Sequence, residues 1–303
     1  MDRRTFVKRT LSASIGLGAL MKAGDVFSAF AGIPVPYDLV AIKGGEPDTM
    51  FDEGIKALGG MKRFVKKGDK VVVKPNIGWD VSPERAGDTN PKLVARIIQH
   101  CFEAGAKEVS VVDHTCDQWQ RCYSNSGIQK AASEAGAKVV PGGTQSYYHT
   151  VSVPNGKVLK SAQEHEVILD ADVFINVPIL KNHSGSRLTM GMKNLMGNVW
   201  DREYWHRTDL HQCIADFATY RKPTLNVLDA YYVMKQNGPR GISVNDLVAM
   251  KSQIISTDIV ALDVAGAKLF GIDPNEVRYI RIAADMKIGR ADLENLNIKR
   301  ILM

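Results

Sequence analysis

Apolar residues along the chain alternate between short continuous runs and runs with helical spacing. The continuous runs predict buried strands over Leu39–Lys43, Lys70–Lys74, Val109–Val112, Lys138–Val140, Val173–Val177, Thr224–Leu228 and Val248–Ser252. The helically spaced runs and their capping residues predict helices over Thr49–Leu58, Pro91–Ala104, Ile128–Ala135, Leu210–Tyr220, Ile259–Phe270 and Glu276–Met286. This alternation predicts an α/β fold with a mostly parallel sheet covered by helices on both faces.

Two further patterns bear on the domain organisation. The segment Glu103–Val109 recurs as Glu134–Val140, 31 residues later, which is the length of one strand–helix unit. Residues 142–166 interrupt the alternation with glycines, tyrosines and the turn Pro154-Asn155-Gly156, and they predict a small β insertion. Because no long linker divides the remainder, we expect residues 32–303 to form a single α/β domain.

The N-terminal residues 1–31 have the three parts of an export signal. Asp2-Arg3-Arg4-Thr5-Phe6-Val7-Lys8 resembles the twin-arginine consensus, the weakly apolar stretch Leu11–Leu20 follows, and Ala29-Phe30-Ala31 forms a cleavage site. The alternative is a chance arginine pair before an amphipathic helix. We expect export by the twin-arginine translocase, and a mature chain that begins near Gly32 and works in the periplasm or outside the cell. The apolar stretch is shorter than the roughly 20 residues of a spanning helix, so we expect no membrane span in the mature chain.

Charge and cysteine content narrow the classes of partner. Without residues 1–31 the net charge falls from +6 to +3, and no basic–aromatic patch is present, so we expect no nucleic-acid partner. The four cysteines have no C-x-x-C spacing, which excludes a ferredoxin-type iron–sulfur motif. Cys116 and Cys122 flank Trp119 in a polar segment, and an oxidising compartment would allow a disulfide between them.

Polar residues follow three of the predicted strands. They are Lys74 and Asn76 after the second strand, Asp113 and His114 after the third, and Lys181, His183, Arg187, Lys193 and Asn194 beyond Val173–Val177, where Pro178 is expected to end the strand. Because parallel strands end at one edge of a sheet, we expect these groups to converge there. Each group also has a simpler explanation as a solvated charge or a turn residue. Convergence would give a site in which lysine and arginine bind an anion and histidine transfers a proton.

Several familiar catalytic signatures are absent. The chain has no H-E-x-x-H, no G-x-S-x-G and no G-x-x-x-x-G-K-[ST], so metalloprotease, hydrolase-elbow and P-loop functions are unsupported. G-x-G-x-x-G does not follow any predicted strand, which leaves a dinucleotide site unsupported as well.

Three motifs carry a resemblance to a known family. Lys74-Pro75-Asn76, the run from Lys181-Asn182-His183 to Lys193-Asn194-Leu195-Met196-Gly197, and Ser256–Asp263 resemble the domain-of-unknown-function family 362, from about Asp38 to Asp285. The family name leaves its activity open. Many members carry an added ferredoxin-like cysteine segment, which this chain lacks.

A more remote similarity is to the nickel-pincer lactate racemase family. His183 and Lys193 are ten positions apart and Gly197 follows, which is similar to the catalytic histidine and cofactor-bearing lysine of that family. The resemblance implies acid–base roles for His183 and His114, a cofactor anchor at Lys193, a metal ligand at His211, and a metal or metal-organic cofactor. The surrounding residues, Ser184-Gly185-Ser186-Arg187, depart from that family's pattern.

Two functions of different classes remain open. The first is an exported enzyme that acts on a small anionic substrate, with catalysis by His183, His114, Asp113 and Lys193 and anion binding by Lys74, Asn76, Lys181, Arg187 and Asn194. The second is a non-catalytic periplasmic protein that binds an anion or handles a cofactor.

Overall fold

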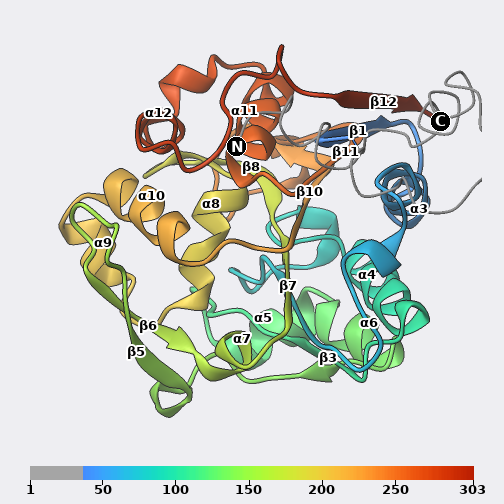
Figure 1. Cartoon of the computed structure of the whole chain (residues 1–303), viewed down its shortest axis with the longest axis horizontal. Coiled ribbons are helices and arrows are strands. Elements are labelled where there is room, and N and C mark those ends of the chain that lie inside the picture. The colour runs from blue at the N-terminus through green and yellow to red at the C-terminus, as the bar shows by residue number, and fades with distance from the viewer. Residues whose placement is uncertain (1–36) are drawn as a thin grey trace, which may run out of the picture. The chain divides into compact units, whose positions relative to one another are not determined.

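The strands of the large sheet follow the order β12-β1-β11-β10-β7-β2-β3-β4, and all of them except β12 overlap strands predicted from the sequence (Figure 1). They are β1 (Leu39–Lys43), β2 (Lys70–Pro75), β3 (Glu108–Val111), β4 (Lys138–Val139), β7 (Val173–Val177), β10 (Leu225–Met234), β11 (Leu247–Ser256) and β12 (Ile298–Leu302). The strands from β10 to β4 are parallel neighbours and β1 is parallel to β12, whereas β11 is antiparallel to β10 and β1. The sheet is therefore mostly parallel, as predicted.

The structure is a computed structural model, and it describes residues 37–303. The predicted export signal, residues 1–31, lies outside the described residues. Within the described part of the chain, no helix combines the length and the apolar composition needed to cross a membrane.

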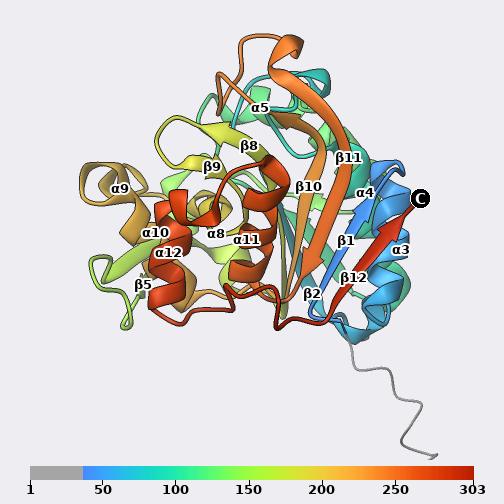
Figure 2. The ribbon, with the colours of Figure 1, turned by 90° about the horizontal axis from the view of Figure 1, so that it is seen from above.

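Helices cover both faces of the sheet, as the sequence predicted (Figure 2). One face packs against α3 (Pro47–Ala57), α4 (Pro91–Ala104), α5 (Trp119–Asn125) and α6 (Ile128–Glu134). The other packs against α8 (Gly191–Asn194), α9 (Glu203–Arg207), α10 (Leu210–Tyr220), α11 (Ile259–Phe270) and α12 (Arg278–Asp285), with the short α7 (Glu166–Leu169). Because side chains alternate along a strand, Val71 and Val73 enter the first core and Val72 enters the second.

Local capping fixes the ends of the two most regular helices. The Asn90 side chain accepts a hydrogen bond from the Lys92 amide at 3.0 Å to begin α4, and Gly105 ends it with φ 106°. The Asp258 carboxylate likewise caps α11, and Gly271 ends that helix with φ 94°. The bounds of both helices match the prediction.

The predicted β insertion is an antiparallel pair, β5 (Tyr148–Ser152) and β6 (Ser161–His165). Its connecting loop is anchored to α10, because the Asp216 carboxylate accepts hydrogen bonds from the amides of Val158 at 2.6 Å and Leu159 at 2.8 Å. The insertion therefore belongs to the same domain as the large sheet.

The segment after Pro178 differs from the prediction. We expected a loop, but the chain forms β8 (Ile179–His183), which pairs with β10, and β9 (Arg187–Thr189), which pairs with β8. Proline lacks only the N–H group, and the Pro178 carbonyl still accepts a hydrogen bond from the Asp229 amide at 2.8 Å. Lys181 and His183 thus lie on a strand, which holds them more rigidly than a loop would.

Candidate functional site

A cavity of about 290 Å³ lies at the carboxyl edge of β2 and β3, beside β8 and α8. Its lining consists of Lys74, Asn76, Gly78, Trp79, Asp113, His114, Cys116, Lys181, His183, Ser184, Thr189, Lys193, Asn194, Met196, Gly197, Arg202, His206 and Pro239. Eight of the ten residues named from the sequence are therefore brought together, all except Arg187 and His211.

The floor of the cavity contains a fully buried ion pair. The Lys74 ammonium lies 2.8 Å from Asp113 Oδ1 and donates a hydrogen bond to the Asn194 carbonyl at 2.5 Å. The other carboxylate oxygen of Asp113 accepts the Ile77 amide at 2.6 Å. Burial lowers the pKa of Lys74 and the Asp113 carboxylate opposes that change. Both charges are held by several contacts, which indicates a fixed scaffold beneath the cavity.

A row of asparagines connects this floor to the centre of the sheet. Asn76 donates a hydrogen bond to Asn194 at 2.9 Å, and Asn194 donates in turn to Asn176 at 2.9 Å. Asn176 donates to Asn226 at 3.0 Å, so the row crosses β2, β7 and β10. Such a buried chain of amides holds each member in one orientation, because breaking any link leaves a buried polar group unpaired.

Lys181 is the second buried lysine of the cavity. Its ammonium donates hydrogen bonds to Asn76 Oδ1 at 3.0 Å and to the Gly87 carbonyl. Burial lowers the pKa of Lys181, and the nearby Asp88 carboxylate opposes this effect. Lys181 therefore contributes positive charge to the cavity while its hydrogen bonds fix its position.

Lys193 differs from these two lysines. It lies on α8, whose first amides are held by a buried carboxylate: the Asp263 oxygens accept the Gly191 amide at 2.6 Å and the Met192 amide at 3.0 Å. Among the described residues, the Lys193 ammonium has no hydrogen-bond or ion-pair partner, although the side chain is half-buried. Burial lowers its pKa to about 8, and the neighbouring cations Arg202 and Lys181 act in the same direction.

His114 is held as one tautomer. Its Nδ1 lies 2.8 Å from the Val199 carbonyl, which can only accept, so the proton is on Nδ1 and Nε2 keeps its lone pair. The ring stacks on Trp200 with centroids 4.8 Å apart and an interplanar angle of 5°. Burial and the Arg202 charge lower the pKa of His114 to about 4, so the imidazole is neutral at pH 7.

His183 is held as the opposite tautomer. Its Nδ1 accepts hydrogen bonds from the Gly185 amide at 3.0 Å and the Ser186 amide at 3.3 Å, which places the proton on Nε2. Burial and the charge of Lys193 lower the pKa of His183 to about 2. One neutral imidazole at the cavity therefore offers a lone pair, and the other offers an N–H group.

The balance of charge in the cavity is positive. Arg202 is fixed by hydrogen bonds from its guanidinium to the carbonyls of His114, at 2.6 Å, and Thr115. Together with the three lysines it gives four cationic side chains against one lining carboxylate, Asp113. An anion is the ligand that such a cavity favours.

Two residues predicted for the site lie outside the cavity. Arg187 is exposed and forms an ion pair with Glu276 at 3.0 Å, so its charge is already neutralised at the surface. His211 lies on α10 beside the Tyr279 ring, with centroids 6.1 Å apart. Arg187 on β9 and His211 on α10 therefore do not contribute to the lining of the cavity.

The predicted metal ligand has no partners of the right kind. Within residues 37–303, no group of three or more histidine, cysteine, aspartate or glutamate side chains is arranged to hold a metal ion. The residues present do not fit the metal centre that the racemase resemblance implied.

Several residues that line the cavity were not assigned to the site from the sequence. Cys116 and Thr189 were not assigned to the site, and Arg202 and His206 lie on a segment whose position the sequence pattern did not reveal. The Thr189 hydroxyl is buried without a hydrogen-bond partner among residues 37–303, and the residue is 3% exposed. The disulfide that an oxidising compartment would allow between Cys116 and Cys122 is not formed in the structure: both thiols are free, with Cys122 buried in α5 and Cys116 exposed at the cavity.

The loop between β10 and β11 reaches over the cavity, and Pro239 is part of the lining. The Gly238 amide donates a hydrogen bond to Asn182 Oδ1 at 3.0 Å, and the Arg240 guanidinium lies 3.6 Å from Asp117 Oδ2. These contacts attach the loop to β8 and to the segment that follows β3.

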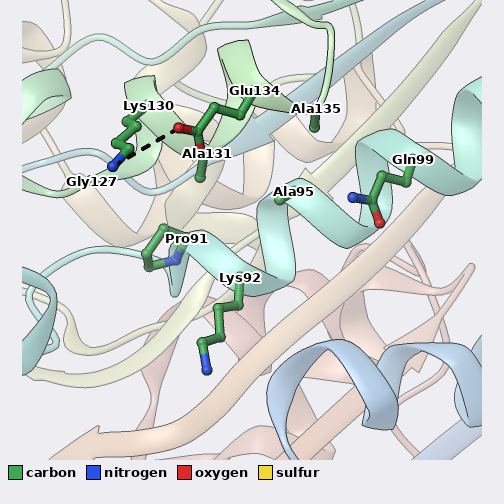
Figure 3. Close-up of a pocket in the computed structure, with 9 residues that line it drawn as sticks. All are labelled: Pro91, Lys92, Ala95, Gln99, Gly127, Lys130, Ala131, Glu134 and Ala135. Atoms are coloured by element: carbon green, nitrogen blue, oxygen red, sulfur yellow. Dashed lines mark ion pairs between the residues drawn. The ribbon is translucent and has the colours of Figure 1, made fainter.

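A second hollow, of about 360 Å³, lies between α4 and α6 (Figure 3). Small side chains form most of its wall, and its one acid, Glu134, lies 3.9 Å from the Lys130 ammonium on the same helix. Lys92 extends from its edge without a partner group of opposite charge in the wall. No histidine, cysteine or buried charge lines this hollow, so it lacks the chemistry of the first cavity.

Comparisons with known proteins agree with the motifs. Residues 71–268 match the family model "Domain of unknown function (DUF362)". A thylakoid-associated protein, sll1697, of Synechocystis sp. is 29% identical over 245 residues, covering 78% of this chain and 73% of that protein. The lactate racemase apoprotein from Thermoanaerobacterium thermosaccharolyticum is similar with a TM-score of 0.36 and 12% identity. That match covers 77% of this chain and 48% of the racemase, so this chain spans about half the length of that protein.

Proposed function

Because this chain belongs to the DUF362 family, whose name leaves its activity open, we propose a function from the cavity itself: an enzyme that binds a small anionic substrate and moves a proton with His114 and His183. We also propose that the protein is exported by the twin-arginine route and acts in the periplasm or outside the cell. The export proposal is supported by the sequence of residues 1–31.

The observation that carries the enzymatic proposal is the pair of opposite tautomers in one cationic cavity. His114 Nε2 is a proton acceptor, and His183 Nε2–H is a hydrogen-bond donor, because backbone groups fix the other nitrogen of each ring. A substrate held between them could lose a proton to His114 while His183 stabilises the developing negative charge on a substrate oxygen.

Burial and the charge of Arg202 lower the pKa of His114 to about 4. A bound carboxylate would offset the field of Arg202 and raise that pKa, which makes His114 a better base when substrate is present. Lys181 and Arg202 would hold the carboxylate, since charge-assisted hydrogen bonds are the strongest contacts available there. The Lys74–Asp113 pair would support the floor of the cavity without contacting the reacting atoms of the substrate.

Proton abstraction can be tested without knowing the physiological substrate. The full chain, after export, is incubated in D₂O with a panel of two- to four-carbon carboxylic acids that bear a hydroxyl or carbonyl group. Deuterium at the carbon beside the carboxylate is followed by proton NMR. We expect exchange in at least one acid, and its loss in His114→Gln but not in Lys92→Ala, which changes a residue outside the cavity.

The alternative, a non-catalytic binding protein, gives a different result in the same samples. Calorimetry with oxalate reports whether the cavity binds an anion at all. Oxalate binding without exchange in any acid would refute the catalytic proposal and favour the binding protein.

A further inference from the structure

The three cavity lysines are not equivalent, and the difference points to a specific chemistry. The amines of Lys74 and Lys181 donate to two oxygen atoms each, from Asp113 and Asn194 and from Asn76 and Gly87 respectively. The Lys193 amine lines the same cavity and has no such partner among the described residues. A half-buried ammonium without a counter-charge is costly, whereas a neutral amine in that position is not.

From this difference, and on the basis of the function proposed above, we infer that Lys193 is a nucleophilic amine that forms an imine with a small carboxylate carrying a carbonyl group, such as a 2-oxo acid.

The groups around Lys193 favour the free amine. Lys181 on β8, Lys74 on β2 and Arg202 beside α9 are cations that disfavour another positive charge, and burial has the largest effect on the Lys193 pKa. The Cys116 thiol is the opposing group, since its thiolate form would favour the ammonium. With a pKa of about 8, Lys193 presents on the order of a hundred times more free amine at pH 7 than an ordinary lysine.

The rest of the cavity suits a 2-oxo acid. Lys181 and Arg202 supply positive charge for the carboxylate, and the His183 Nε2–H group can donate to the carbonyl oxygen. The Thr189 hydroxyl is buried at the cavity and has no hydrogen-bond partner in the described part of the chain, so it is one more group that a ligand would satisfy. These features are independent of the state of Lys193 and also indicate a polar ligand.

The step balances without any further reactant. The nitrogen of the amine bonds to the carbonyl carbon, the C=O electron pair moves to oxygen, and a proton passes from nitrogen to that oxygen to give a carbinolamine. The nitrogen then loses its second proton, a C=N bond forms, and the oxygen leaves as water with both of the original amine protons. His114 Nε2 is the lone pair available to carry each proton between the two atoms.

Borohydride trapping tests the inference directly. The exported full chain is incubated with pyruvate and sodium cyanoborohydride at pH 7, and the adduct is located by intact-mass and peptide mass spectrometry. We expect one reduced pyruvyl group per chain, on Lys193, and strong suppression by excess oxalate, which lacks a reducible ketone. Lys193→Arg keeps the positive charge and is expected to show no adduct. Exposed Lys92 is the internal control for random labelling.

Because the adduct is located by peptide mass spectrometry in the unaltered protein, the test remains valid even if Lys193→Arg does not fold. An absence of adduct, or an adduct spread over exposed lysines including Lys92, would overturn the imine. Oxalate calorimetry on the same preparation separates the two proposals. Oxalate binding without the Lys193 adduct removes only the imine, whereas an absence of oxalate binding removes the anion site itself.

Discussion

Replacing Gly197 with alanine tests the buried floor of the cavity. A Cβ atom at this position would lie 1.8 Å from Asp113 Oδ1 and 2.5 Å from Lys74 Nζ. The clash cannot be relieved by a small movement, because the Asp113 carboxylate is held by the Ile77 amide and the Lys74 ammonium by the Asn194 carbonyl. Gly197→Ala should therefore separate the two charges or displace the whole segment.

The magnitude follows from the burial of the pair. The Lys74 and Asp113 side chains are only 1% and 2% exposed, so separating them leaves charges that water cannot reach. Disrupting a buried ion pair typically costs about 3–5 kcal/mol. For a domain of this size we expect the melting temperature to fall by roughly 10 °C.

Gly78→Ala is the matched control. Gly78 also lines the cavity, but a Cβ atom there would lie 3.5 Å from Asn76 Oδ1, which is an ordinary contact. Neither glycine has a positive φ, so backbone strain does not distinguish them. Urea unfolding followed by tryptophan fluorescence compares the two variants. If Gly197→Ala lowers the free energy of unfolding by less than about 1 kcal/mol, or by no more than Gly78→Ala does, the buried ion pair does not stabilise the fold.

Three further predictions concern single groups of the site. Thr189→Val should change the unfolding free energy by less than about 1 kcal/mol, because the hydroxyl has no hydrogen-bond partner among the described residues. The same variant should bind oxalate roughly fivefold more weakly in calorimetry, and equal affinity would show that the hydroxyl does not face the ligand. Burial raises the pKa of Asp263 to about 7 from 3.8, so the folded protein binds the extra proton and its unfolding free energy should fall as pH rises from 4 to 7. Asp263→Asn, beside the Gly191 and Met192 amides, should lack that fall, and parallel curves for the two proteins would contradict the assignment. Oxalate affinity should drop roughly tenfold between pH 7 and pH 9 as Lys193 loses its charge, and Lys193→Arg should reduce that drop.

Much of the fold could be predicted because its elements begin and end with local chemistry. Asn90 before Pro91 and Gly105 at the other end set α4 through contacts within a few residues, and the same holds for Asp258 and α11. Elements that depend on distant pairing were not predictable in this way. The strand β12 exists because it pairs with β1, some 260 residues earlier in the chain, and β8 exists because β10 continues beyond its predicted end at Leu228.

The meeting of the strand ends could be predicted for a similar reason. Parallel strands share a carboxyl edge, so Lys74, Asp113 and His114 had to approach one another once the sheet was correct. Arg202 and Thr189 were missed because they come from segments whose position is set by tertiary packing. His211 was included through the racemase resemblance, and it lies on α10 beside Tyr279, outside the cavity.

The roles of the individual side chains could not be predicted from the sequence, because they depend on atoms that other parts of the chain supply. Lys74 and Lys193 are the same residue type in the same cavity, yet one is neutralised by a carboxylate and the other has no counter-charge among the described residues. His114 and His183 likewise present opposite nitrogens, since a carbonyl fixes one ring and two amides fix the other. It follows that the chemistry of this cavity has to be read from the partners of its lysines and histidines rather than from the motif that contains them.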